Sequence, residues 1–234
     1  NSDSKIIGYT GGIVSTSSAR MYAYEGETWG DIWGFETDRY FTEDDFNGKD
    51  ANGKWIYKDG VANQTGIQTD NFVFGPGDIK YKDLDGNGVI DGGKGTADDH
   101  GDLKVIGNTL PRYEYSFHLG GSWKGIDLDL FFQGVGKRDM WTQSSFVFPL
   151  MRDADKAIYA NQTSYNIYDP ENGIVDISQS NRYPCLYSGN EASGNVSGLA
   201  PIGGSHNYYP QTKYLVNMAY LRLKNVTIGY TLPA

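Results

Sequence analysis

Two neighbouring segments, residues 112–119 and 122–133, alternate between apolar and polar side chains, and this alternation restricts the fold more than any other feature of the chain. A period of two places alternate side chains on opposite faces of a β-strand. The first segment alternates Tyr113, Tyr115, Phe117 and Leu119 with Glu114, Ser116 and His118, and the second alternates Ile126, Leu128, Leu130 and Phe132 with Asp127, Asp129, Phe131 and Gln133. We therefore expect an antiparallel hairpin with one apolar and one largely polar face.

The turn of this hairpin has two candidates, Gly120-Gly121 and Lys124-Gly125, because each pair contains glycine. A further strand is predicted within residues 213–232. There Leu221 and Leu223 share one phase, while Val226, Ile228, Tyr230 and Leu232 share the other. A bulge or bend near Lys224 and Asn225 must therefore shift the register by one residue.

The composition excludes several classes of protein. No apolar run approaches the roughly 18 residues of a membrane-spanning helix, and the mean hydropathy is -0.52. Soluble β proteins and transmembrane β-barrels both remain, because barrel strands alternate and score as polar on average. The 31 glycines and 18 tyrosines favour short strands joined by tight turns. A net charge of -9 argues against a nucleic-acid partner, and the single Cys185 excludes an internal disulfide.

An acidic, glycine-containing loop precedes the hairpin and matches the first nine positions of an EF-hand calcium loop. The expected ligands are Asp83, Asp85, Asn87, Asp91 and the carbonyl of Val89. Lys94 occupies the position of the last acidic ligand, so one of Asp98, Asp99 and Asp102 would have to complete the site. The alternative is an acidic turn whose carboxylates accept backbone N–H groups without a metal.

Three tryptophans, Trp29, Trp33 and Trp55, are candidates for stacking against sugar rings, and the alternative is that they pack beneath a loop. No catalytic constellation accompanies them, because His100, His118 and His206 have no nucleophile motif nearby. We expect no enzymatic activity.

Smaller signals concern local structure. Thr42 with Asp45 three residues later predicts a capped helical turn. Residues 54–57 predict part of a hairpin, and residues 152–161 carry a weak helical signal. Short strand-like pieces are expected over residues 5–9, 13–14 and 20–24.

A set of motifs follows one another in a specific order. They are Pro76-Gly77-Asp78-Ile79-Lys80-Tyr81-Lys82-Asp83 with the acidic loop, Val105-Ile106-Gly107-Asn108, Leu110-Pro111, Tyr115, Phe117, Asp127-Leu128, Phe131-Phe132-Gln133-Gly134, and residues 220–233. Together with the aromatic and glycine-rich residues 25–41, this set resembles the C-terminal barrel region of SusC/RagA-type TonB-dependent outer-membrane transporters. The resemblance covers about half of the chain.

The resemblance implies an all-β fold, in which residues 1–234 are part of one transmembrane β-barrel with antiparallel strands. Residues 25–75 and 142–213 would be long extracellular loops, and the plug domain would lie outside these residues. The implied function is TonB-energised uptake of oligosaccharides or peptides across the cell outer membrane, with a SusD-like surface lipoprotein as partner. It also makes Asp102 the best candidate for the last calcium ligand, across an insertion in the loop.

A second hypothesis is that the chain is a water-soluble protein. It is a secreted, calcium-stabilised β-sandwich that binds glycans through Trp29, Trp33 or Trp55. A sandwich would cover its apolar sheet face with a second sheet, so the surroundings of that face distinguish the two hypotheses.

Overall fold

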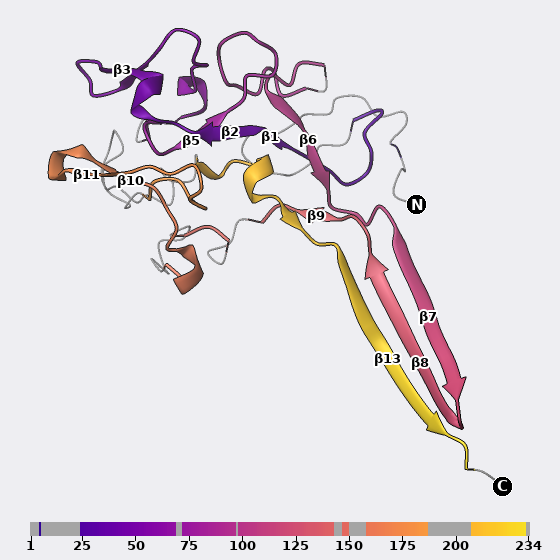
Figure 1. Cartoon of the computed structure of the whole chain (residues 1–234). Helices are drawn as coiled ribbons and strands as arrows, with labels where there is room; N and C mark the ends of the chain where they lie inside the picture. The colour runs from indigo at the N-terminus through magenta and orange to yellow at the C-terminus, as the bar shows by residue number, and fades with distance from the viewer. Residues whose placement is uncertain are drawn as a thin grey trace.

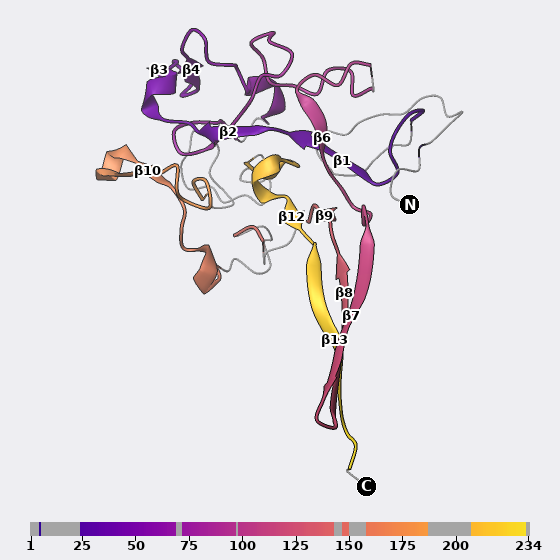
Figure 2. The same cartoon turned by 45° about the vertical axis from the view of Figure 1, so that its right-hand side comes forward.

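The computed structural model describes residues 5, 24–68, 72–96, 98–142, 147–149, 158–186 and 207–232. Within them the chain forms a head of short strands and turns, from which one long three-stranded sheet projects (Figures 1 and 2). The three short strand-like pieces predicted before residue 24 fall almost entirely outside the described residues, as does most of the helix predicted over 152–161.

The strands pair antiparallel in six small sheets. In chain order the strands are β1 (Asp31–Phe35), β2 (Thr37–Tyr40), β3 (Phe46–Lys49), β4 (Trp55–Tyr57), β5 (Ile79–Tyr81), β6 (Leu103–Asn108), β7 (Glu114–Trp123), β8 (Ile126–Val135), β9 (Asp139–Met140), β10 (Ile167–Asp169), β11 (Ile174–Asp176), β12 (Val216–Asn217) and β13 (Tyr220–Tyr230). The 3-10 turns that lie wholly within the described residues are η1 (Glu43–Asp45), η2 (Thr65–Ile67), η3 (Ala160–Gln162), η4 (Pro170–Asn172) and η6 (Thr212–Tyr214).

The all-β prediction is confirmed for the described residues, which contain no α-helix. The closed barrel is not found there, since the largest sheet has three strands. No helix in the described part of the chain is long and apolar enough to cross a membrane.

The projecting sheet has the strand order β13-β8-β7. Its hairpin turns at Lys124 and Gly125, both with positive φ (48° and 83°), as tight hairpin turns require. The turn expected at Gly120-Gly121 is therefore wrong: both glycines lie inside β7, where they pair with Asp129 and Leu128 of β8. The predicted bulge is confirmed, because the register between β13 and β8 shifts between Leu223 and Asn225.

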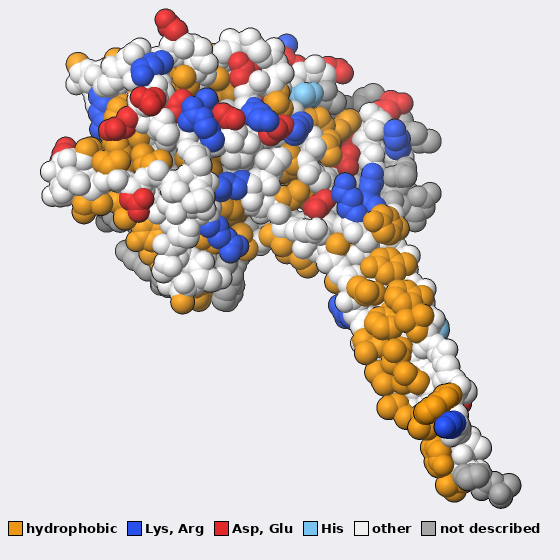
Figure 3. Space-filling model, in the orientation of Figure 1, with side chains coloured by type: hydrophobic (Ala, Val, Ile, Leu, Met, Phe, Trp, Pro, Cys, Tyr) orange, Lys and Arg blue, Asp and Glu red, His pale blue; other side chains and the backbone are white. Residues whose placement is uncertain are grey.

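One face of this sheet is apolar and exposed. Its central row pairs Leu119 with Leu130 and Leu130 with Val226, and Phe117 stacks on Phe132 at 4.9 Å between ring centroids. The space-filling view shows hydrophobic side chains running along the whole projecting sheet (Figure 3). Tyr113 and Tyr115 lie toward the head end of the face, and Trp123 and Tyr230 lie near the hairpin end. No described strand covers this face.

The opposite face of the sheet is mostly polar. His118 contacts Asp129 at 3.4 Å (Nδ1 to Oδ1), and Ser122 hydrogen-bonds to Asp127. Phe131 is an apolar residue on this face, and its ring stacks on the His118 imidazole at 4.5 Å. The period of two in the sequence therefore separates the two faces as predicted.

The head has a core of aromatic side chains. Phe35, Phe41, Phe74 and Phe148 are fully buried, together with Ile79, Ile90 and Leu103. The described parts of residues 25–75 and 142–213, the predicted long loops, supply most of this core. Phe148, Tyr183 and Tyr208 of the second segment belong to one buried cluster with Phe35, Tyr40 and Phe46 of β1, β2 and β3. The described parts of these two segments therefore pack together in the core of the head.

Buried polar side chains join distant segments of the head. Asp78, which has no exposed surface, accepts hydrogen bonds from Gly75 N–H (2.9 Å) and Asn207 Nδ2 (2.9 Å). Asn207 Oδ1 in turn accepts from Ile79 N–H at 2.7 Å. Because these groups satisfy one another, the irregular backbone can be buried without the cost of unpaired polar groups.

Two local predictions are confirmed in the head. Thr42 and Asp45 form the capping box of η1, with Thr42 N–H donating to Asp45 Oδ2 at 2.8 Å. Residues 55–57 form β4, which pairs with β3.

Candidate metal loop and adjoining pocket

The acidic loop follows β5 and brings three of its predicted ligands together. Oxygens of Asp83, Asp85 and Asp102 lie within 4.8 Å of one another. Gly86 and Gly88 have positive φ (77° and 82°), which lets the backbone turn tightly around these carboxylates. The insertion between Asp91 and Asp102 is closed by the Asp102 N–H, which donates to the Asp91 carbonyl at 3.0 Å.

Backbone N–H groups orient the three carboxylates. Asp83 accepts from Gly86 (2.7 Å) and Gly88 (2.8 Å). Asp102 accepts from Leu84 (2.6 Å) and Asp91 (2.9 Å), and it has no exposed surface. These contacts fix the carboxylate positions, and they also satisfy the oxygens as the metal-free alternative requires.

The electrostatics of the loop favour a cation. Burial raises the pKa of the Asp102 carboxyl, and the negative charges of Asp85 and Asp83 raise it further, against the lowering effect of the two N–H donors. Grouped carboxylate oxygens are the ligands that Ca²⁺ prefers. The loop is therefore chemically suited to a hard divalent cation.

The remaining predicted ligands lie around this group. Asn87 accepts from Val89 N–H (2.7 Å) and donates to Asp85 (2.9 Å). Asp91 Oδ1 instead accepts a hydrogen bond from Gly93 N–H at 2.6 Å. Its side chain therefore contacts the backbone of the insertion and is not among the three grouped carboxylates. Val89 forms an isolated bridge with Asn63.

Two backbone hydrogen bonds to Asn63 fix the loop to the head. Asn63 N–H donates to the Gly88 carbonyl at 2.9 Å, and Ile90 N–H donates to the Asn63 carbonyl at 2.8 Å. Ile90 is fully buried in the core. A change in the loop would therefore reach the packing of the head.

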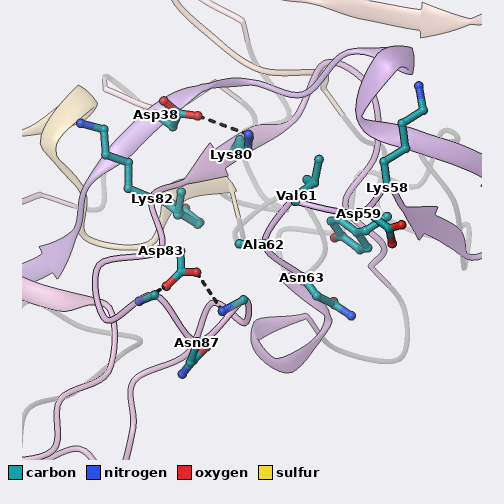
Figure 4. Close-up of a pocket in the computed structure, with 15 residues that line it drawn as sticks. Asp38, Lys58, Asp59, Val61, Ala62, Asn63, Lys80, Lys82, Asp83 and Asn87 are labelled. Carbon is teal, nitrogen blue, oxygen red and sulfur yellow. Dashed lines mark hydrogen bonds and ion pairs between the residues drawn. The ribbon is translucent and has the colours of Figure 1, made fainter.

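A pocket of about 690 Å³ adjoins the loop (Figure 4). Asp83 and Asn87 line one side, together with Tyr57 at the end of β4 and with Lys58 and Asn63 from the segment that follows it. Asp38 and Lys80 line it as well and form an ion pair at 3.4 Å. The sequence does not predict this pocket, because apart from the acidic loop its walls come from separate segments that carry no motif for binding.

The three predicted stacking tryptophans lie in different surroundings. Trp29 is 53% exposed. Trp33, on β1, packs against Tyr24 and His100, with ring centroids 6.1 and 5.1 Å away. Trp55, on β4, packs against Phe46 at 5.0 Å and lies under the Lys49 ammonium. Trp33 and Trp55 belong to different sheets and are both partly buried against the core.

Comparison with known proteins gives one informative similarity. No protein-family model matches the chain. The chain is 25% identical over 209 residues to TonB-dependent receptor P3 of Formosa agariphila. This alignment covers 89% of the chain but 16% of that receptor, so the chain spans only a small part of the relative's length. The similarity supports the TonB-dependent receptor part of the predicted resemblance.

Proposed function

We propose that the chain forms part of the barrel wall and the extracellular head of a SusC/RagA-type TonB-dependent transporter, which imports oligosaccharides or peptides across the outer membrane. The observation that carries this proposal is the exposed apolar face of the three-stranded sheet. Leu119, Val226 and Ile228 on this face are 55%, 49% and 72% exposed. In water such a face would be costly, whereas in a bilayer it is solvated by lipid.

The dimensions of the sheet fit a bilayer. β7 and β8 have 10 residues each and β13 has 11, and a transmembrane β-strand needs about 9–11 residues at a tilt of about 45°. Ten residues span about 34 Å along the strand, which at that tilt corresponds to an apolar band about 25 Å tall. The aromatic residues near both ends of the face match the interfacial girdles of outer-membrane barrels.

The connections of the sheet suggest its orientation. β7 and β8 are joined by the two-residue turn at Lys124 and Gly125, whereas β8 and β13 are joined through the head. Outer-membrane barrels have short turns on the periplasmic side and long loops outside. The proposal therefore places the head on the cell surface, where a SusD-like lipoprotein would contact it. The contact with TonB would be made through a plug domain, as the family resemblance implies.

Within this proposal, the head contributes to substrate binding. Trp29 is the best placed of the three tryptophans to stack on a sugar ring, because half of its surface is free. Trp33 and Trp55 would contribute through the edges that their packing leaves exposed. The sandwich hypothesis gains no support from the sheet, since no second sheet in the described residues covers its apolar face.

We also propose that the acidic loop holds Ca²⁺. Asp83, Asp85 and Asp102 would be its carboxylate ligands, since they are already grouped. Asn87, the Val89 carbonyl and Asp91 are the further candidates, and Asp91 would have to turn away from Gly93 N–H to take part. The ion would offset the repulsion between the grouped carboxylates and hold the loop against β5.

Lipid contact can be tested in the parent transporter reconstituted in liposomes. Cys185 is first replaced by serine, and Val226→Cys and Thr227→Cys are then labelled separately with bimane. These neighbours face opposite sides of the sheet. Brominated phospholipids should quench bimane strongly at position 226 and weakly at position 227. Equal quenching at both positions, or a parent that shows no heat-modifiable mobility on gels, would contradict the proposal.

A further inference from the structure

A second pocket, of about 600 Å³, lies where the head meets β12, the short strand that precedes β13. Two cations line it, Arg182 and Lys213, and its described lining contains no Asp or Glu. This is unusual in a chain whose net charge is -9.

Both cations lie over tyrosine rings rather than beside carboxylates. The Lys213 ammonium is 4.5 Å from the centroid of the Tyr40 ring, and the Arg182 guanidinium carbon is 5.4 Å from that of Tyr183. Neither forms an ion pair with a carboxylate of the described residues. Partial burial lowers the pKa of Lys213, as expected for an ammonium without a compensating anion.

The frame of the pocket is fixed by three tyrosine hydroxyls. Tyr40 donates to the Asn181 carbonyl (3.0 Å), Tyr214 donates to the Arg182 carbonyl (2.7 Å), and Tyr183 donates to the Val147 carbonyl (2.9 Å). The three accepting residues all line the pocket. The backbone that presents the cations is therefore held in place before any ligand arrives, which reduces the entropy cost of binding.

We propose that this pocket binds a carboxylate or sulfate group of an acidic oligosaccharide, with Arg182 and Lys213 as its anion contacts. Arginine offers a planar fork that matches such oxyanions, and lysine adds a point charge. The inference rests on the proposed transport function, because it names the class of substrate that the head would select.

The walls of the pocket favour a saccharide over an acidic peptide. They consist of Val147, of the turn around residues 179–182, and of η6 with the residues that follow it. The only strand among them is β12, with two residues. A peptide that binds by strand addition needs a longer free edge, whereas a saccharide ring needs hydrogen-bonding groups and a cavity.

The test is a binding titration on the purified parent protein in detergent, with four probes. They are hexagalacturonate, its neutral methyl ester, a sulfated galactan hexasaccharide and hexaglutamate. At least one of the two acidic sugars should bind at least tenfold more tightly than the methyl ester, and hexaglutamate should bind weakly. Arg182→Gln and Lys213→Gln should each weaken binding of the acidic sugar roughly tenfold. Lys54→Gln, which removes an exposed positive charge outside both pockets, should leave it unchanged.

Equal binding of neutral and acidic sugars would overturn the inference, as would wild-type affinity in the Arg182→Gln, Lys213→Gln double variant. Tighter binding of hexaglutamate than of either acidic sugar would show that the ligand of the pocket is an acidic peptide and not a saccharide. Heat-modifiable mobility of the same preparations reports on the barrel separately. A folded barrel with no anion preference would therefore contradict only the inference about the pocket. An anion preference in a protein without barrel behaviour would contradict only the proposed function.

Discussion

The head and the projecting sheet place similar side chains in opposite surroundings. Phe35, Phe41 and Phe74 in the head are fully buried, whereas Phe117 and Leu119 in the sheet are 39% and 55% exposed. The head buries its apolar side chains within the protein itself, as a water-soluble domain does. The sheet leaves them for another medium to cover. Under the proposed function the head is solvated by water and the apolar face of the sheet by lipid, so each region should respond differently to the same kind of substitution.

The largest effect is expected in the core of the head. Phe35 packs against Tyr81 and Tyr209, with ring centroids 4.8 and 6.0 Å away. Phe35→Ala should lower the free energy of unfolding of the head by about 4 kcal/mol, because it removes a buried ring and leaves a cavity. Denaturant titration followed by the fluorescence of Trp33, Trp55 and Trp141 measures this. Phe35→Leu, which fills more of the space, should cost clearly less, and equal losses would argue against a close-packed core.

The next effect concerns the face of the sheet. Val226→Arg should destabilise the membrane-inserted protein by about 2–4 kcal/mol, because a charge near the bilayer midplane is poorly solvated. Thr227→Arg, one residue further along the same strand and on the polar face, is the matched control and should cost under about 1 kcal/mol. Urea unfolding from liposomes compares the two. Similar losses of stability in both variants would show that the two faces of the sheet are not in different surroundings.

The sequence predicted the sheet better than the head, and the reason is physical. A strand pattern is local, so alternation and a phase change were enough to predict the segments that form β7, β8 and β13 and the bulge in β13. The sequence offers two candidates for the hairpin turn, because the glycines inside β7 have no side chain that would show which face they occupy. The head depends on contacts such as that between Asp78 and Asn207, 129 residues apart, which no local pattern contains.

The candidate site was predicted in part for the same reason. The spacing of Asp83 and Asp85 fixes their proximity within a tight turn, and Asp102 joins them across the insertion. The position of Asp91 depends on how the insertion folds back, which its spacing does not specify. The sequence predicts neither pocket, because their lining residues, apart from the acidic loop, come together only in the folded head.

A smaller effect in the head should depend on pH. Asp45 accepts hydrogen bonds from both terminal nitrogens of Arg39, at 2.7 and 2.5 Å. Burial raises the pKa of the Asp45 carboxyl, but the hydrogen bonds from Arg39 and from Thr42 N–H outweigh burial and leave the pKa below its usual value. The carboxylate therefore stabilises the head above the unfolded-state pKa of about 3.9, and this contribution is lost as the pH falls through the lower folded-state pKa.

Asp45→Asn tests this assignment. It should cost about 2 kcal/mol at pH 7, because charge-assisted hydrogen bonds are lost, and the difference from wild type should shrink below about pH 4. Head unfolding curves at pH 3, 5 and 7 measure it. Asp59→Asn, at an exposed carboxyl, should change stability by less than about 0.5 kcal/mol at every pH. A loss at Asp45 that does not vary with pH would assign the effect to packing instead.

The smallest effect is expected from calcium. It tests whether an ion bound in the acidic loop adds to the stability of the head. A site with a dissociation constant near 10⁻⁴ M would add about 1.4 kcal/mol at about 1 mM Ca²⁺. Asp85→Asn should abolish the calcium-dependent rise in melting temperature, because it removes charge from the grouped carboxylates. Asp98→Asn, at a carboxyl outside that group, should preserve the rise. A wild-type melt that is unchanged by calcium would leave the loop as a hydrogen-bonded acidic turn. A calcium response confined to the head, with lipid-dependent stability of the sheet unaffected, would show that the two regions are stabilised by independent means.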